Sequence, residues 1–146
     1  MTKENSEKVE RIYLDTFIFM DVLSGDPVLS VKAASFLDGK DVKHVISAVM
    51  LTELAYHLRR RKSREKTEEI LFYIQSLPNI IIIPVTEEIA MHAGILRAKY
   101  RRLKYPKKFS YFDCIHLATA ISERCTKFVT GDRGFSGIQE IKAEVY

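Results

Sequence analysis

Four consecutive isoleucines stand at positions 80–83. No other feature of the sequence restricts the possible folds of this chain as strongly. The run lies between Pro78 and Pro84, so it is too short for a helix and is bounded by residues that interrupt regular structure. A strand that is apolar at every position has to be covered on both faces, as in a parallel sheet packed between helices. The run therefore favours an α/β fold.

Short β-prone segments alternate with helical segments along the rest of the chain. Strands are expected over residues 11–14, 44–46, 80–83 and 127–130, with an edge strand over 141–145. Helices are expected over residues 16–23, 28–37, 48–62, 65–77, 86–103 and 110–124. This alternation predicts an α/β domain with a mostly parallel central sheet.

Length and composition narrow the class of protein. A chain of 146 residues is expected to form one domain over residues 1–146, with a polar, mixed-charge extension over 1–10 that matches neither a signal nor a transit peptide. No apolar run approaches the roughly 18 residues of a membrane helix. Cys114 and Cys125 match no zinc motif and cannot build a disulfide framework. A cytoplasmic protein without membrane contact is expected.

Positive charge is concentrated in two stretches of the chain. Residues 59–66 carry six basic groups and one acid, and residues 97–108 carry seven basic groups and no acid, while the other 126 residues have a net charge of −8. Concentrated positive charge suits a polyanion such as RNA, although it can also simply solvate helix ends. The candidate RNA-binding residues are Arg59, Arg60, Arg61, Lys62, Arg101, Arg102, Lys104, Lys107 and Lys108. Tyr100 and Tyr105 interleave the second stretch and are candidates for base stacking or for packing.

Four acidic residues stand out by their positions. Asp15 and Asp132 follow predicted strands, and Glu53 and Asp113 lie early in predicted helices. Each has a purely structural explanation. Asp15 suits a helix N-cap, Glu53 a solvated first turn, Ser110 with Asp113 a capping box, and Asp132 a turn between glycines.

Ligands of parallel sheets bind beyond the carboxyl ends of the strands, where one edge could gather all four acids. Clustered carboxylates repel one another, and a divalent cation relieves that repulsion. A set of oxygen ligands favours Mg²⁺ or Mn²⁺ over zinc. Such a cation can activate water and stabilise the charge of a phosphodiester under attack, which unites the acids and the basic stretches in one function.

The motifs around these acids resemble those of PIN-domain ribonucleases, most closely the VapC-type toxins of toxin–antitoxin pairs. They are Tyr-Leu-Asp15-Thr, Thr-Glu53-Leu, Ser-Tyr-Phe-Asp113-Cys-Ile-His-Leu-Ala-Thr-Ala and Val-Thr-Gly-Asp132-Arg-Gly-Phe, within residues 11–145. The resemblance implies a three-layer α/β/α sandwich with a mostly parallel sheet, and Mg²⁺- or Mn²⁺-dependent cleavage of single-stranded RNA.

The same resemblance assigns roles to individual residues. It implies that Asp15, Glu53, Asp113 and Asp132 are the catalytic, metal-binding acids and that the hydroxyls of Thr16 and Thr130 support them. It also implies an antitoxin partner and a homodimer. The residue after Asp-Thr is often small and polar in this family, whereas here it is Phe17. Asp21, further along the same helix, is interpreted as a solvent-exposed or supporting residue.

Other functions are open on the sequence alone. They include a housekeeping RNA-processing nuclease, a non-catalytic RNA- or protein-binding module of the same fold, and a phosphohydrolase with Asp15 as nucleophile, although Phe17 stands where that chemistry usually has a second Asp. The Glu53–His57 and Asp113–His116 spacings could serve a transition metal in a helical bundle, but the predicted strands argue against one. His116 is accordingly expected to be packed or on the surface, and Cys114 to be a small buried residue.

Overall fold

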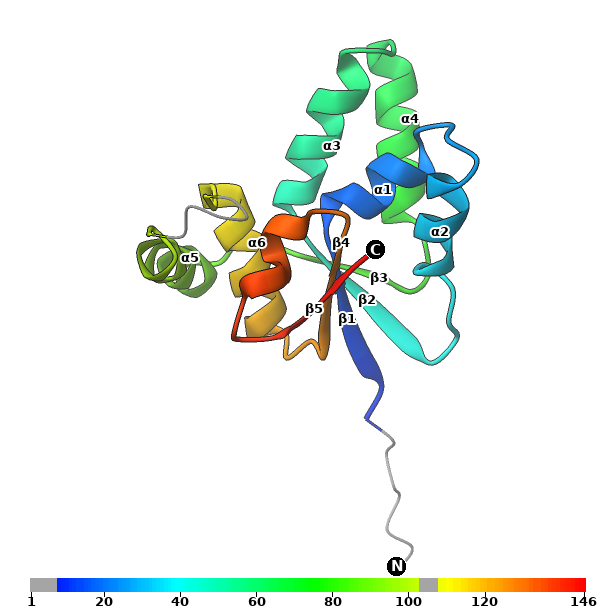
Figure 1. Ribbon diagram of the computed structural model, residues 1–146. Helices are drawn as coiled ribbons and strands as arrows, with labels where there is room; N and C mark the ends of the chain where they lie inside the picture. Colours follow the sequence, from blue (N-terminus) through cyan, green and yellow to red (C-terminus); the bar gives the residue numbers. More distant parts are fainter. Residues whose placement is uncertain (1–7, 103–107) are drawn as a thin grey trace, which may run out of the picture.

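In the part of the chain that the structure describes, five parallel strands form the central sheet, and the isoleucine run is one of them. The computed structural model describes residues 8–102 and 108–146. The strands are β1 (Glu10–Leu14), β2 (Val42–Ser47), β3 (Ile80–Ile83), β4 (Lys127–Thr130) and β5 (Lys142–Val145). Their order across the sheet is β3-β2-β1-β4-β5, with every neighbouring pair parallel (Figure 1). The expected edge strand is therefore confirmed as β5.

Within residues 8–102 and 108–146, six helices and one 3₁₀ helix connect the strands. They are α1 (Thr16–Val22), α2 (Leu29–Ser35), α3 (Val49–Arg59), α4 (Arg64–Gln75), α5 (Glu87–Lys99), α6 (Tyr111–Ser122) and η1 (Arg133–Gly137). All six predicted helices are present, with ends that differ by a few residues. The short η1 has no hydrophobic period long enough to reveal it in the sequence.

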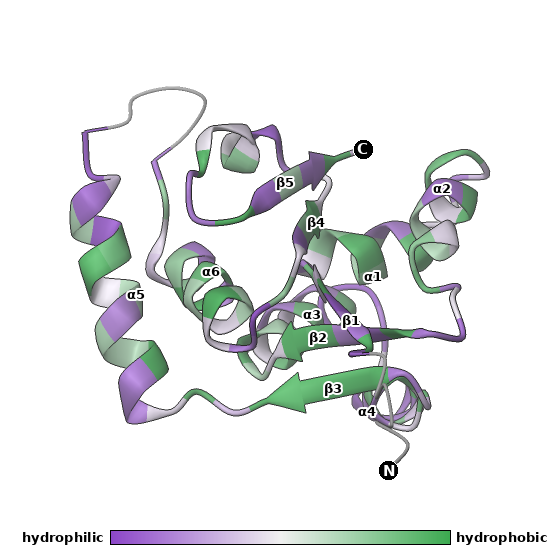
Figure 2. Ribbon diagram, turned by 90° about the horizontal axis from the view of Figure 1, so that it is seen from below, coloured by the Kyte–Doolittle hydropathy of each residue, from purple (hydrophilic) through white to green (hydrophobic). Residues whose placement is uncertain are grey.

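Alternate residues of each central strand enter two different cores. Tyr13, Val45 and Phe128 pack with α5, α6 and η1 on one face of the sheet. Leu14, Ile46 and Val129, the residues that follow them, pack with α1, α3 and α4 on the other face. Side chains of a strand alternate between faces, so two helical layers require the apolar residues at consecutive positions that the sequence contains. This is the expected three-layer α/β/α sandwich (Figure 2).

Side chains cap the helices where the sequence predicts it. The Thr86 hydroxyl accepts a hydrogen bond from the Ile89 amide at the start of α5, and Ser110 forms a reciprocal capping box with Asp113 at the start of α6.

In the described residues no helix is long and apolar enough to span a bilayer.

The end of α5 is tied to the segment before β5 by Glu140. Its carboxylate lies 2.6 Å from Lys99 Nζ and accepts hydrogen bonds from the Tyr100 hydroxyl at 2.7 and 2.9 Å. Partial burial raises the pKa of Glu140, but the Lys99 and Tyr100 hydrogen bonds outweigh it and leave that pKa below its ordinary value. Tyr100 is thus a buried packing residue, so the prediction that it could stack on a base is corrected.

Glu140→Gln should lower the free energy of unfolding by about 0.5–1 kcal/mol at pH 7, because the charge-assisted hydrogen bonds are weakened at a partly solvated site. A lowered folded-state pKa stabilises the protein above the ordinary carboxyl pKa, and this contribution disappears as the pH falls through the folded-state value. Urea denaturation at pH 7 and pH 3 measures both effects. Glu144→Gln, at a more exposed pair with Lys127, is the control and should change stability less. An equal loss for Glu140→Gln at both pH values would contradict the ionic origin.

Candidate functional site

The candidate site lies where the chain order of the strands reverses. From β1 the chain builds β2 and β3 on one side of the sheet and then returns to place β4 on the other side of β1. In parallel α/β sheets the crevice at the carboxyl ends of strands beside such a switch point is where ligands bind. Asp15 follows β1 and Asp132 follows β4, and the Asp15 amide donates a hydrogen bond to the Val129 carbonyl at 3.0 Å.

Asp15 is a buried carboxylate, with 4% of the residue exposed. It occupies the N-cap position of α1, yet its side chain accepts no capping hydrogen bond, so the N-cap interpretation describes its position but not its contacts. Its Oδ2 instead accepts a hydrogen bond of 2.7 Å from the Thr130 hydroxyl. Burial raises the pKa of Asp15 above its ordinary value, although His116 and Thr130 oppose that shift.

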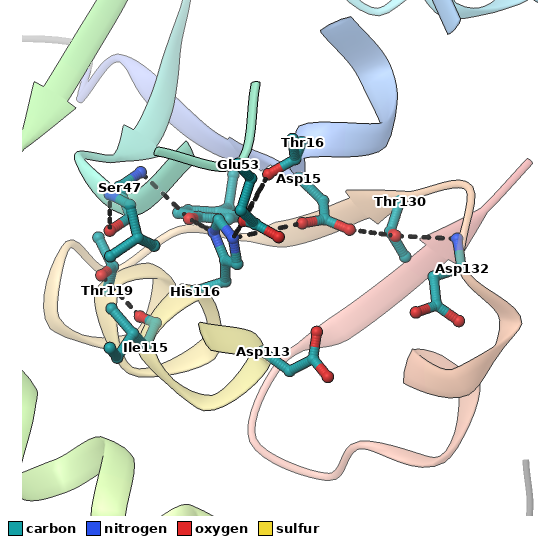
Figure 3. A network of polar contacts seen from close by, with 12 residues as sticks. Asp15, Thr16, Ser47, Glu53, Asp113, Ile115, His116, Thr119, Thr130 and Asp132 are labelled. Atoms are coloured by element: carbon teal, nitrogen blue, oxygen red, sulfur yellow. Dashed lines mark hydrogen bonds and ion pairs between the residues drawn. The ribbon is translucent and has the colours of Figure 1, made fainter. Parts of the chain in front are cut away.

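A chain of polar contacts connects Glu53 to the interior of the sheet through His116. His116 Nε2 lies 2.5 Å from Glu53 Oε1 and 3.8 Å from Asp15 Oδ1 (Figure 3). On the other side of the ring, Nδ1 lies 2.5 Å from the Tyr13 hydroxyl oxygen, which also accepts a hydrogen bond from the Ser47 amide. Glu53 is therefore not a merely solvated residue.

Thr16 completes the support of Glu53. Its hydroxyl donates a hydrogen bond of 2.9 Å to Glu53 Oε1, and its Oγ1 lies 3.4 Å from His116 Nε2. Thr16 starts α1 directly after Asp15, while Glu53 lies in the second turn of α3. The contact consequently joins the segment after β1 to the helix after β2.

Glu53 and His116 shift each other's pKa in the directions that favour the charged form of each. Burial lowers the pKa of His116, but the Glu53 hydrogen bond and the Asp15 charge outweigh burial and raise that pKa above its ordinary value. The pKa of Glu53 is lowered, because contacts with His116 and Thr16 exceed the opposing effect of burial. The pKa of each group therefore depends on the presence of the other.

Asp113 and Asp132 have the structural roles that their local sequences predict. Asp113 Oδ2 accepts the Ser110 amide hydrogen bond at 2.8 Å in the capping box, and Asp132 Oδ1 accepts that of Gly134 at 2.8 Å in a turn. The Thr130 hydroxyl also accepts a hydrogen bond from the Asp132 amide, which links this turn to Asp15. In Figure 3 the carboxylates of Asp113 and Asp132 are turned toward the space beside the Asp15–Thr130 pair.

The donor chemistry at this edge suits a hard divalent cation, but the arrangement is not a ready-made metal site. The predicted ligands are all carboxylates, as Mg²⁺ and Mn²⁺ prefer. Within residues 8–102 and 108–146, however, no three His, Cys, Asp or Glu side chains form a group that could hold a metal ion. Glu53 is already bonded to His116 and Thr16.

His116 and Tyr13 are the members of the network that sequence reasoning missed. The structure buries His116 at the centre of the site, with 1% exposed, which confirms the packed alternative and adds contacts with Glu53 and Tyr13 that were not predicted. The available signal was its place three residues after Asp113, because residues three apart lie on neighbouring positions of a helix face. Tyr13 is hidden in an apolar strand, and only its contact with His116 reveals its polar role.

The two basic stretches lie at helix ends. Arg59, Arg60, Arg61 and Lys62 close α3 and start the turn to α4, and Arg59 Nη1 donates to the Lys62 carbonyl. Beside them an open pocket of about 500 Å³ is lined by the apolar Met20, Leu54 and Leu58 and by Arg60, Arg61 and Lys62. Arg101, Arg102 and Lys108 are exposed in the second stretch, whereas Lys104, Tyr105 and Lys107 lie outside the described residues.

Two further residues of the α1 region now have partners. Asp21 accepts a hydrogen bond of 2.5 Å from the Tyr146 hydroxyl, so its role is to hold the C-terminal residue. Phe17 is partly exposed, and a Cβ atom built on Gly131 would lie 3.3 Å from its ring. Phe17 and Tyr146 therefore pack closely over the turn that follows β4.

Comparison with known proteins agrees with this architecture. A model of the PIN domain family matches residues 12–141. No curated protein sequence matches significantly. VapBC2 from Rickettsia felis, bound to a DNA fragment from its promoter, has a TM-score of 0.70 at 20% identity, with 93% of this chain and 98% of that chain covered.

Two other solved structures have the same fold. DNA-bound VapBC from Salmonella typhimurium has a TM-score of 0.67 at 22% identity, covering 93% of this chain and 98% of that one. VapC20 from Mycobacterium tuberculosis, a sarcin–ricin loop cleaving toxin, has a TM-score of 0.67 at 18% identity, covering 90% and 98%. At these identities the likeness concerns the fold.

Thr130→Val should lower the free energy of unfolding by about 1–3 kcal/mol, because it leaves the buried Asp15 carboxylate and the Asp132 amide without the hydroxyl. Thr130→Ser, which keeps the hydroxyl, is the matched control and should retain most of the stability. Denaturant titration of both variants measures the difference. Equal destabilisation by Val and Ser would mean that the methyl group, not the hydroxyl, is what matters.

Proposed function

Since this chain belongs to the PIN domain family, we propose that it is a metal-dependent endoribonuclease that cleaves single-stranded RNA. The observation that carries the proposal is the Glu53–His116–Asp15–Thr130 network at the switch point of the sheet. A fold with no reaction to perform has little reason to place a buried acid, a half-buried acid and a buried imidazole at the edge where ligands bind.

The proposed metal is Mg²⁺ or Mn²⁺. Asp15, Asp113 and Asp132 are its proposed ligands, and Glu53 is a ligand directly or through water. When bound, such an ion lowers the pKa of a coordinated water and stabilises negative charge on a phosphodiester. Because the described residues form no ready-made group, the proposal requires the carboxylates to adjust when the ion binds.

The chain's own residues hold these acids in place. The Thr130 hydroxyl orients Asp15, while Thr16 and His116 orient Glu53. Tyr13 holds the opposite nitrogen of the His116 ring, so the imidazole cannot turn away from Glu53. Side chains of this supporting kind typically change activity about 10–100-fold when they are removed.

The basic residues are proposed to bind the RNA backbone. Arg59, Arg60, Arg61 and Lys62 lie at the end of α3, the helix that carries Glu53, and Arg101, Arg102 and Lys108 flank the approach to α6, which carries Asp113. Lys104 and Lys107 belong to the same proposal by sequence. Positive charge on these two sides suits a strand that crosses the edge of the sheet between them.

A toxin role is part of the proposal. Complexes named VapBC, and a toxin that cleaves the sarcin–ricin loop, share the fold. The proposed partners are therefore an antitoxin protein and a second copy of this chain, with action on RNA in the cytoplasm. Met91 and Ile95 on α5, each about two-thirds exposed at 67% and 69%, are available for a homodimer contact.

One observation favours a second candidate, a non-catalytic RNA-binding module. Glu53 already has His116 as a hydrogen-bonding partner at 2.5 Å, so a metal ion is not the only group that can stabilise its carboxylate. Titration calorimetry separates the two functions, because the nuclease should bind Mg²⁺ or Mn²⁺ at up to about millimolar concentrations.

Incubation of the protein with labelled single-stranded RNA and Mg²⁺ or Mn²⁺ should yield cleavage that EDTA abolishes. Asp15→Asn should reduce the rate by more than about 100-fold, beyond the usual cost of losing a supporting residue. Asp41→Asn, at an exposed position before β2, is the matched control and should cleave normally. A toxin should also arrest growth when expressed, and Asp15→Asn should abolish the arrest. Cleavage that survives EDTA or Asp15→Asn would contradict the proposal.

The double variant Arg61→Gln/Lys62→Gln should weaken RNA binding and flatten its salt dependence by about 0.7 in log Kd against log salt for each lost phosphate contact. Lys40→Gln/Lys43→Gln, at the opposite edge of the sheet, changes the net charge equally and is the control. Fluorescence anisotropy at several salt concentrations measures both slopes. Identical slopes for the two variants would exclude a local phosphate contact near the end of α3.

A further inference from the structure

An exposed aromatic ring at the start of α6 has no role in either core. Tyr111 is 66% exposed and the next residue, Phe112, is 37% exposed. We propose, on the basis of the proposed RNA cleavage, that Tyr111 is a platform on which a base of the RNA strand stacks. Every base has a flat π face, so a ring of this kind binds a nucleotide with little regard for its sequence.

Arg97 holds this ring from α5. Its guanidinium carbon lies 4.0 Å from the centre of the Tyr111 ring, well within the range of a cation–π contact. Its Nε is buried and has no hydrogen-bond partner in the described part of the chain. The cation–π contact with Tyr111 is thus the interaction that the structure shows for this guanidinium in the described part of the chain.

The platform lies close to the proposed catalytic edge. Tyr111 precedes Asp113 by two residues in the first turn of α6, and successive helical residues rise by 1.5 Å. Residues two apart on a helix point about 200° apart, so the two side chains leave α6 on different sides. A base stacked on Tyr111 would therefore belong to a different nucleotide from the one at the carboxylates.

The charge around the ring favours RNA as its occupant. Arg97 contacts the ring, Arg101 and Arg102 follow α5, and Lys108 precedes α6 by three residues. By contrast, the exposed Phe72 and Tyr73 lie near the end of α4, whose Arg64 and Lys66 are paired with Glu68 and Glu69, and α4 packs on the other face of the sheet. Tyr73 is 67% exposed, so it is an exposure-matched control in a different electrostatic setting.

The test uses short single-stranded RNAs that contain 2-aminopurine, with EDTA present so that no cleavage occurs. Wild-type protein should quench the fluorescent base by stacking. Tyr111→Ala should raise Kd by about tenfold, within the range for losing one stacked base, and should relieve the quenching. Tyr111→Phe should retain both properties, and Tyr73→Ala should match the wild type. Arg97→Lys should give an intermediate Kd, because lysine lacks the planar group.

The outcomes separate this platform from the proposed function. RNA binding by the wild type with unchanged Kd and quenching in Tyr111→Ala would overturn the platform alone. Absence of RNA binding by the wild type would overturn both proposals. Sedimentation of all variants provides a further check, since a Tyr111→Ala protein that loses a homodimer while retaining base quenching would mean that the ring is a protein contact.

Discussion

The parallel pairing of β1 with β4 is the constraint on which the rest of this molecule depends. The chain adds β2 and β3 on one side of β1 and then returns to add β4 on the other side. The order of the strands therefore reverses beside β1, which creates the switch point. The segments after both strands then meet at one edge, although Asp15 and Thr130 are 115 positions apart. The same pairing buries both faces of the central strands and requires the two helical layers.

Polar groups placed at that edge are stable only as a connected set. Burial disfavours the charged form of Asp15, Glu53 and His116 alike. Their mutual contacts and two threonine hydroxyls outweigh this effect for Glu53 and His116 and oppose it in part for Asp15. Four elements contribute to the set, namely the segment after β1, α3, α6 and the end of β4. The network thus orders the site and also fastens α3 and α6 to the sheet.

The charge of the exposed side chains differs between regions of the surface. Basic side chains gather at the end of α3 and beyond α5, while ion pairs cover the outside of α4. Arg97 links α5 to α6, because its guanidinium lies over the exposed Tyr111 ring. Basic side chains thus occur in both helical layers, at the end of α3 in one and around α5 in the other.

The sequence alone determined the strands and helices, the parallel sheet and the positions of the four acids at strand ends and helix starts. These are local properties, since hydrophobic period, capping residues and turn residues act over a few positions. Only the tertiary structure decided that Glu53 pairs with His116, that Tyr13 supports that ring, and that Tyr100 is buried while Tyr111 is exposed. Such contacts join residues from different elements, and their energies depend on burial and distance, which no local pattern encodes.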